Sequence, residues 1–199
     1  MFKWKVLFVC RANQVRSQFA EAILTKLDPY RFCAYSAGFQ IEENLYPSTQ
    51  GIHPKAYNLL KSRGYSVNEL FVKHFDEFLN KIDNMDFIIT LCDKDLETPK
   101  VDYPAFLGQP VKAIWGVHDP VLLGGDEDKK DRTFLDVFNI IRRRIELFVS
   151  LPEKGLKELS IKPELNKLDK PVKIEKKIMP DDKPHKKKKN KKNKKNKNN

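Results

Sequence analysis

The chain has 199 residues, which is enough for one domain with a sizeable hydrophobic core. Its formal net charge of +11 resides entirely in residues 152–199, because that segment holds 18 Lys and no Arg against 7 acidic residues, whereas residues 1–151 are balanced. The basic pI therefore says nothing about a ligand of the N-terminal part. No stretch approaches the ~20 apolar residues of a transmembrane segment, and residues 1–5 do not resemble a cleavable signal.

The cysteine content indicates the kind of compartment in which the protein works. Cys10, Cys33 and Cys92 are too few for a disulfide scaffold. We therefore expect a soluble, cytoplasmic protein in a reducing environment, where a cysteine is more often catalytic than structural. The His and Cys residues show no metal-ligand spacing, so neither a metal nor another cofactor is expected.

The first half of the chain alternates between strand and helix patterns. In chain order we predict a strand at residues 6–9, a helix from Ser17, a strand at 32–35 ending in Ser36-Ala37-Gly38, a loop at 40–52, a helix from His53-Pro54 to Gly64 and a short helix at 75–82. The strands are continuous apolar runs, as strands buried on both faces should be.

The second half continues the pattern up to Leu151. We predict strands at residues 87–91 and 112–117, a loop at 122–130 and a long helix that stops before Pro152. Strands that alternate with helices indicate an α/β fold with a parallel sheet covered on both faces.

Beyond Leu151 the periodicity decays. Residues 186–199 are 9 Lys and 5 Asn, so charge repulsion and a lack of apolar side chains predict disorder. The predicted division is a catalytic domain at residues 1–151 and a Lys-rich tail at 152–199. We favour a solvated tail; the alternative is a binding module with weak, salt-sensitive attraction to nucleic acid or an anionic membrane.

Cys10 and Arg16 are the residues that the sequence predicts to be catalytic. Cys10 ends the first strand and Arg16 begins the first helix, a junction where backbone N–H groups and the helix dipole bind anions. The same field favours a thiolate at Cys10, to which Ser17 can donate a hydrogen bond. The planar fork of Arg16 matches two oxygens of a tetrahedral oxyanion. The competing interpretation, an inert buried cysteine after an apolar strand, is disfavoured by this context.

A thiolate that attacks phosphorus also needs an acid for the leaving oxygen. Asp119 is the candidate, because it follows the strand at 112–117 and can reach the same edge of the sheet. The alternative interpretation is an ordinary turn aspartate before Pro120.

At these residues the chain resembles the low-molecular-weight protein tyrosine phosphatase superfamily, particularly its bacterial phosphatase and arsenate reductase branch. The likeness runs from about Val6 to Leu151. Its marks are Cys10-Arg11-Ala12-Asn13-Gln14-Val15-Arg16-Ser17-Gln18-Phe19-Ala20-Glu21-Ala22, Ser36-Ala37-Gly38, His53-Pro54-Lys55-Ala56, Ile89-Thr90-Leu91-Cys92, Gly108-Gln109-Pro110 and Trp115-Gly116-Val117-His118-Asp119-Pro120.

The resemblance implies a four-stranded parallel sheet flanked by helices. It also implies that Cys10 is the nucleophile, Arg16 the oxyanion binder and Asp119 the general acid. Asn13 would take an unusual backbone conformation tied to Ser36, and Ser17 would stabilise the thiolate. The residues expected to bind substrate are Arg11, Ala12, Asn13, Gln14, Val15 and Ser17, with Ser36 and Cys92 in supporting positions.

Departures from the family pattern leave two activities open. Val121 and Leu122 stand where eukaryotic-type phosphatases carry aromatic residues. Cys92 matches the second cysteine of the thioredoxin-coupled reductases, but the third is missing. The first hypothesis is a phosphomonoesterase that works through a cysteinyl-phosphate on a phosphorylated substrate. The second is an arsenate reductase that uses Cys10 with an external thiol reductant.

Overall fold

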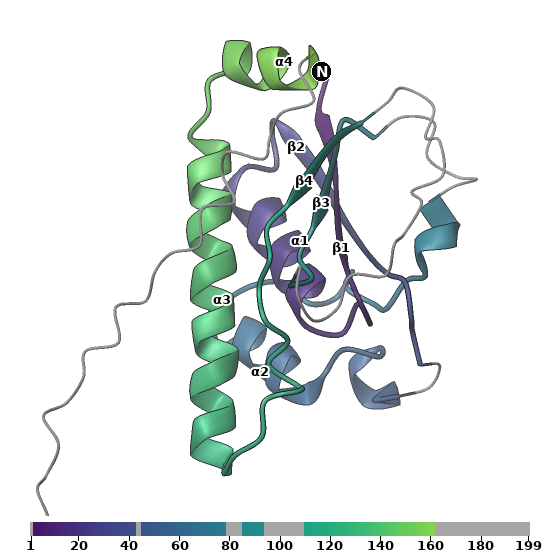
Figure 1. Cartoon of the computed structure of the whole chain (residues 1–199), viewed down its shortest axis with the longest axis vertical. Helices are drawn as coiled ribbons and strands as arrows, with labels where there is room; N and C mark the ends of the chain where they lie inside the picture. The colour runs from purple at the N-terminus through teal and green to yellow at the C-terminus, as the bar shows by residue number, and fades with distance from the viewer. Residues whose placement is uncertain (1, 43–44, 79–84, 94–109, 162–199) are drawn as a thin grey trace, which may run out of the picture.

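Four parallel strands form the centre of the molecule. The computed structural model describes residues 2–42, 45–78, 85–93 and 110–161. Strands β1 (Trp4–Cys10), β2 (Phe32–Gly38), β3 (Phe87–Thr90) and β4 (Val111–Ile114) pair in the order β2-β1-β3-β4 (Figure 1). The predicted α/β class and the four-stranded parallel sheet are confirmed. The carboxyl ends of all four strands therefore meet at one edge.

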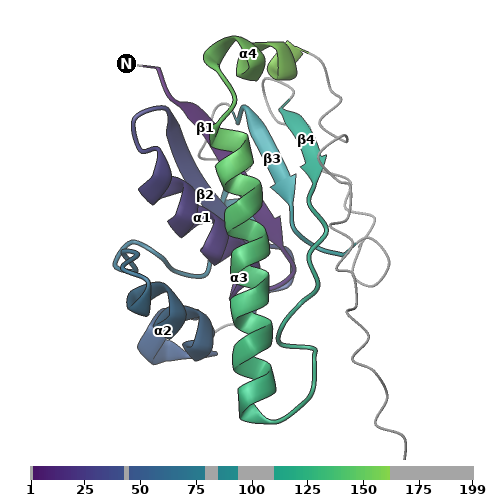
Figure 2. The ribbon, with the colours of Figure 1, turned by 90° about the vertical axis from the view of Figure 1, so that its left-hand side faces the viewer.

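Helices α1 (Arg16–Leu27) and α3 (Glu127–Val149) cover one face of this sheet (Figure 2). Helices α2 (Pro54–Ser62) and α4 (Glu153–Ile161) pack into the same core, with α2 beyond the carboxyl ends of the strands and α4 at the opposite end (Figure 2). Helices α1 and α3 run across the same face, where the rings of Phe19 and Phe138 pack edge to face (Figure 2). Every second residue of β1, among them Val6 and Phe8, enters this main core. The position of α1, and with it of Arg16, is fixed by that burial.

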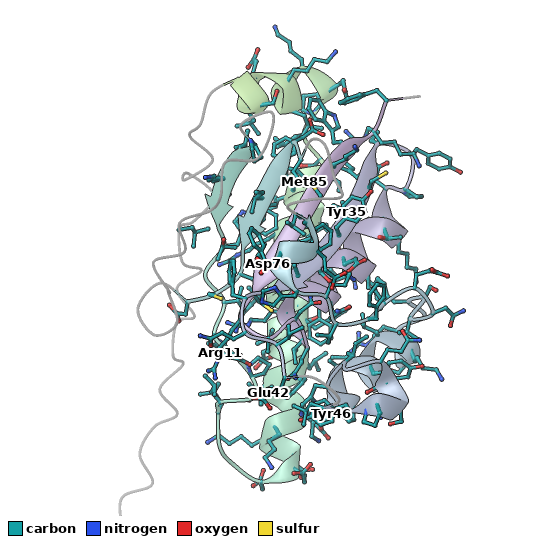
Figure 3. The ribbon with its side chains drawn as sticks, turned by 90° about the vertical axis from the view of Figure 1, so that its right-hand side faces the viewer. Arg11, Tyr35, Glu42, Tyr46, Asp76 and Met85 are labelled. Atoms are coloured by element: carbon teal, nitrogen blue, oxygen red, sulfur yellow. The ribbon has the colours of Figure 1, made fainter. Side chains whose placement is uncertain are left out.

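The opposite face has a smaller core. Leu7, Val9 and Ile88 point to this side and pack with Phe75 and Phe78 of the 3₁₀ turn η2 (Phe75–Phe78) and with Met85. Figure 3 shows this face, with Met85 and Tyr35 in front of the sheet. Of the helix predicted for residues 75–82, the described part is only this 3₁₀ turn, and residues 79–82 lie outside the described residues.

Several other boundaries also differ from the prediction, and the contacts explain two of them. Strand β4 ends at Ile114, although backbone bonds from Trp115 N to Thr90 O (2.7 Å) and from Val117 N to Leu91 O (3.0 Å) keep the chain beside β3. Helix α3 begins at Glu127, inside the predicted loop, because Asp126 caps it by accepting from Lys129 N at 2.8 Å.

Helix α4 corrects the predicted start of the tail at Pro152. Leu156 of this helix is fully buried, and Trp4 Nε1 donates to Glu153 Oε1 at 3.1 Å. Residues 153–161 thus belong to the folded part, while the rest of the predicted tail, 162–199, lies outside the described residues. Within the described ranges, no helix combines the length and apolarity needed to cross a bilayer.

Candidate active site

The 10–17 loop connects β1 to α1 at the carboxyl edge of the sheet. Cys10 is the last residue of β1 and Arg16 the first of α1, and both are nearly inaccessible to solvent, at 2% and 1% exposed. Asn13 between them has a φ of 55°, a left-handed conformation that a non-glycine residue adopts at a cost. The loop therefore curls back toward β1 instead of running straight into the helix.

Side-chain hydrogen bonds behind the loop hold this conformation. Asn13 Nδ2 donates to Ser17 Oγ (2.7 Å) and to Ser36 Oγ (2.9 Å), and Ser17 Oγ lies 3.0 Å from Cys10 Sγ. Asn13 Oδ1 accepts from Lys73 N at 2.8 Å and from Gln18 Nε2 at 3.1 Å. Each of these hydrogen bonds holds the Asn13 side chain in the same position, and together they offset the cost of its left-handed backbone conformation.

Helix α2 supports the loop from the other side. The backbone N–H of His53, the residue before α2, donates to Gln14 O at 3.1 Å. His53 Nδ1 accepts from Lys55 N at 3.2 Å and so caps the helix. Burial lowers the pKa of His53, which favours the neutral ring that this acceptor role requires.

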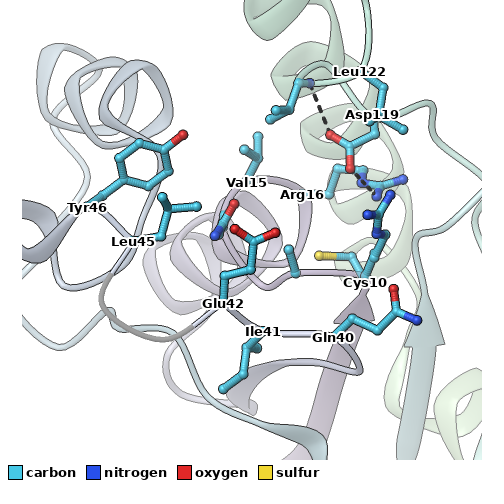
Figure 4. A pocket seen from close by; sticks show the side chains of 14 residues that line it. Cys10, Val15, Arg16, Gln40, Ile41, Glu42, Leu45, Tyr46, Asp119 and Leu122 are labelled. Atoms are coloured by element: carbon cyan, nitrogen blue, oxygen red, sulfur yellow. Dashed lines mark hydrogen bonds and ion pairs between the residues drawn. The ribbon is translucent and has the colours of Figure 1, made fainter.

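Arg16 and Asp119 meet although they are 103 residues apart. Arg16 Nη2 donates to Asp119 Oδ2 at 2.7 Å (Figure 4). Its Nη1 donates to Val117 O at 2.8 Å. Asp119 Oδ1 accepts from Val121 N at 3.1 Å, which fixes the carboxylate in its turn. The guanidinium is thus anchored by the chain that follows β4.

Cys10, Arg16 and Asp119 border one cavity of about 360 Å³. Figure 4 shows Cys10, Arg16 and Asp119 on one side of it and Leu45 and Tyr46 on the other. The remaining lining residues are Arg11, Ala12, Gln14, Val15, Gln40, Ile41, Glu42, Val121 and Leu122. A thiol, a guanidinium and a carboxylate therefore share a space larger than an inorganic oxyanion requires.

The structure divides the residues expected to bind substrate, and those expected to support them, by whether they line the cavity. Arg11, Ala12, Gln14 and Val15 line the cavity beside Cys10. Asn13, Ser17 and Ser36 are fully buried behind the loop, where they support it and are not among the lining residues. Cys92 is buried just beyond β3 and is likewise not part of the lining.

Some lining residues and one supporting residue were missed in the sequence. Residues 40–42 and 45–46 come from a segment predicted only as a loop, and Figure 3 shows Glu42 and Tyr46 at the same end of the molecule as Arg11. Tyr46 was detectable as an aromatic residue in a polar loop. The contact of Lys73 with Asn13 left no signal in the sequence.

The absence of a side chain at Gly38 allows the end of β2 to lie close to the loop. A Cβ at this position would stand 2.9 Å from Ala12 C and from Asn13 N. Gly38→Ala is expected to displace the loop backbone and to lower the free energy of unfolding by about 1–3 kcal/mol. Thermal or denaturant unfolding measures the effect. Gly124→Ala is the matched control, because nothing lies within 4 Å of that site; equal losses in the two variants would contradict the packing argument.

The described residues contain no group of three or more His, Cys, Asp or Glu side chains placed to hold a metal ion. The three cysteines are not disulfide-bonded. Cys33 pairs with Lys5 in the sheet and lies five positions from Gly38, the partner of Cys10, which is about 16 Å along the strand. Cys33 therefore cannot exchange with Cys10 in the folded protein.

Comparison with known proteins agrees with this architecture. Residues 5–160 match the family model described as low molecular weight phosphotyrosine protein phosphatase, and the chain belongs to this family. A protein of Halalkalibacterium halodurans named arsenate reductase is 28% identical over 148 residues, which cover 74% of this chain and 96% of that protein.

Solved structures share the fold at lower identity. An arsenate reductase described as being in the phosphate binding state aligns with a TM-score of 0.57 and 22% identity, covering 74% of this chain and 97% of that one. A tyrosine phosphatase of Erwinia amylovora aligns with a TM-score of 0.52 and 19% identity over 73% of this chain and 91% of that one. The chain is therefore an enzyme of the phosphatase superfamily with arsenate reductase relatives.

Proposed function

We propose that the chain is a cysteine-dependent phosphomonoesterase of the protein tyrosine phosphatase type. The observation that carries the proposal is the meeting of Cys10, Arg16 and Asp119 at one cavity, with the first two at a strand-to-helix loop. Each of the three has a separate task in phosphoryl transfer, and no other group is required.

The reaction proceeds in two displacements. The Cys10 thiolate attacks phosphorus as the bond to the leaving oxygen breaks, and Asp119 gives that oxygen its proton. The cysteinyl-phosphate is then attacked by water, which loses a proton to the Asp119 carboxylate, and inorganic phosphate leaves as the thiolate is restored. Arg16 binds two equatorial oxygens through both steps.

The ion pair of Arg16 and Asp119 prepares this sequence. The Asp119 carboxylate accepts a hydrogen bond from the Arg16 guanidinium at 2.7 Å. An entering phosphate dianion replaces it as the partner of Arg16, so Asp119 can take up the proton that it later donates. Val117 O keeps the guanidinium in place during the exchange.

The walls of the cavity support an organic ester as the substrate. Leu45, Tyr46 and Ile41 line one part of it, and Val121 and Leu122, which are 44% and 59% exposed, line another. An inorganic oxyanion gains nothing from such apolar surface, whereas the carbon skeleton of a phosphate ester does.

Arsenate reduction is the second candidate. It is favoured by the relatives named arsenate reductase and by Cys92 beyond β3. In this reaction Cys10 attacks arsenate and expels hydroxide, and a thiol then attacks the Cys10 sulfur, releasing arsenite and forming a disulfide. Because the chain has only three cysteines and Cys33 is remote, the relay would need an external thiol.

One paired assay separates the two activities. The purified chain is given p-nitrophenyl phosphate in one arm, and arsenate with glutathione or a thioredoxin system in the other. We expect steady hydrolysis of the ester and little arsenate-dependent thiol oxidation. Thiol oxidation that depends on arsenate, together with negligible ester hydrolysis, would establish the second candidate instead.

Asp119→Asn tests the assignment of the acid. Turnover of phenyl phosphate is expected to fall by about 10²–10⁴-fold, because its leaving oxygen must be protonated. Hydrolysis of p-nitrophenyl phosphate should fall less, since that leaving group departs as a stable anion. Asp136→Asn, an exposed aspartate on α3, is the matched control. An equal loss for both esters would assign Asp119 a structural role and not that of an acid.

A further inference from the structure

A buried ion pair lies behind the 10–17 loop, and the proposed chemistry does not use it. Lys73 Nζ is 3.1 Å from Glu21 Oε2, and the two side chains are only 8% and 12% exposed. Within the described ranges, Lys73 and Arg16 are the cationic side chains that are buried. A charge pair in such a place is costly unless further hydrogen bonds satisfy it.

The pair is connected to the sulfur of Cys10 by hydrogen bonds with a fixed direction. A Glu21 carboxylate can only accept, so Ser36 Oγ donates to Glu21 Oε2, at 2.5 Å. Ser36 Oγ is then the acceptor for Asn13 Nδ2, whose second proton goes to Ser17 Oγ. Ser17 Oγ accepts from Asn13 and lies 3.0 Å from Cys10 Sγ, to which it donates when the sulfur is a thiolate, because a thiolate can only accept.

The backbone of Lys73 is hydrogen-bonded to the same loop and to the end of β2. Its N–H donates to Asn13 Oδ1 at 2.8 Å, and its carbonyl accepts from Gly38 N at 2.9 Å. Lys73 Nζ also donates to Phe71 O at 3.0 Å. The ammonium is therefore held in one place, and the loop is held to the segment that carries it.

We propose that Lys73 is a positioning residue for the nucleophile, keeping Glu21 ionised so that Ser36, Asn13 and Ser17 are ordered to donate toward the sulfur of Cys10. The proposal rests on the assignment of Cys10 as nucleophile under the proposed function. Burial raises the pKa of Glu21, and the nearby ammonium opposes that rise. Without the ammonium, Glu21 either takes a proton or stays as an unpaired buried anion, and both states disfavour a negatively charged sulfur.

The test measures the reactivity of Cys10 and requires no substrate. Lys73→Met and the unaltered protein are alkylated with iodoacetamide over a range of pH. Trypsin then releases residues 6–11, which contain Cys10 and no other cysteine, for quantification by mass spectrometry. We expect the pH midpoint of alkylation to rise in the variant, with a rate about tenfold lower below that midpoint.

Matched variants separate positioning from a general loss of structure. Lys55→Met removes a lysine from an ion pair at the surface, with Glu127 and Asp131, and should leave the profile unchanged. Lys73→Arg, which keeps the charge, should restore much of the normal profile. Glu21→Gln should shift the profile in the same direction as Lys73→Met, and the double variant should shift it no further, because both act through one connection.

Two results would overturn the role proposed for Lys73, and a third would separate that role from the proposed function. A Lys73→Met protein that shows cooperative thermal unfolding and an unchanged alkylation profile would overturn it, as would additive shifts in the double variant. If Lys73→Met does not fold, Glu21→Gln alone decides by the same profile. A shifted profile in a protein without esterase activity would refute the proposed function and leave the role of Lys73 standing.

Discussion

Replacement of Cys10 by serine is expected to abolish turnover of p-nitrophenyl phosphate, with kcat lower by about 10⁴-fold or more. A serine hydroxyl stays protonated at neutral pH, and its neighbour Ser17, itself a hydroxyl, is not a base that could deprotonate it. The oxygen is smaller than the sulfur, so the buried loop accommodates it. Inorganic phosphate should still bind, which isothermal titration calorimetry can measure.

Cys33→Ser is the control for this experiment. Cys33 lies at the other end of β2 and makes no contribution to the cavity, so its variant should keep the normal rate. A Cys10→Ser protein that retained a kcat within tenfold of normal would show that the sulfur does not form the covalent intermediate.

Arg16→Lys carries the second large effect, a fall in kcat of about 10²–10³-fold. The guanidinium has a planar fork whose orientation Val117 O and Asp119 fix, and a lysine ammonium can supply neither the fork nor two parallel bonds to an oxyanion. A lysine would also make fewer hydrogen bonds than Arg16 does, so the buried carbonyl of Val117 would lose a donor. Steady-state kinetics with the aryl ester measure the loss.

Arg142→Lys is the matched change at the surface, where Arg142 pairs with Glu146 on α3. It should leave kcat unaltered. If Arg16→Lys retained a kcat close to normal, a point charge would be enough at this position and the bidentate clamp would be wrong.

The centre of the fold and the main site residues were predictable because burial leaves a strong pattern. Strands β1 and β3 are hidden on both faces, so they appear in the sequence as continuous apolar runs. Parallel strands bring their carboxyl ends together, and this rule predicts from the sequence that Cys10 and Asp119 lie at one edge of the sheet. The structure places both at the same cavity.

The features that escaped prediction depend on contacts distant in sequence. Helix α4 buries Leu156 against the end of the sheet, which is too short an apolar stripe to stand out in a Lys-rich segment. Tyr46 reaches the cavity from a left-handed conformation with a φ of 61°, which no local pattern indicates. Lys73 reaches Glu21 because the segment beside it pairs with Gly38 through the bridge at His74.

The most direct test of the central claim is a crystal structure of the protein with orthovanadate. Vanadate takes the five-coordinate geometry of phosphorus in transfer, so it reports where nucleophile and clamp converge. We predict a bond from Cys10 Sγ to vanadium, two equatorial oxygens held by the Arg16 guanidinium, and Asp119 facing the oxygen opposite the sulfur. Vanadate bound away from Cys10, or bound there with Arg16 directed elsewhere, would contradict the account.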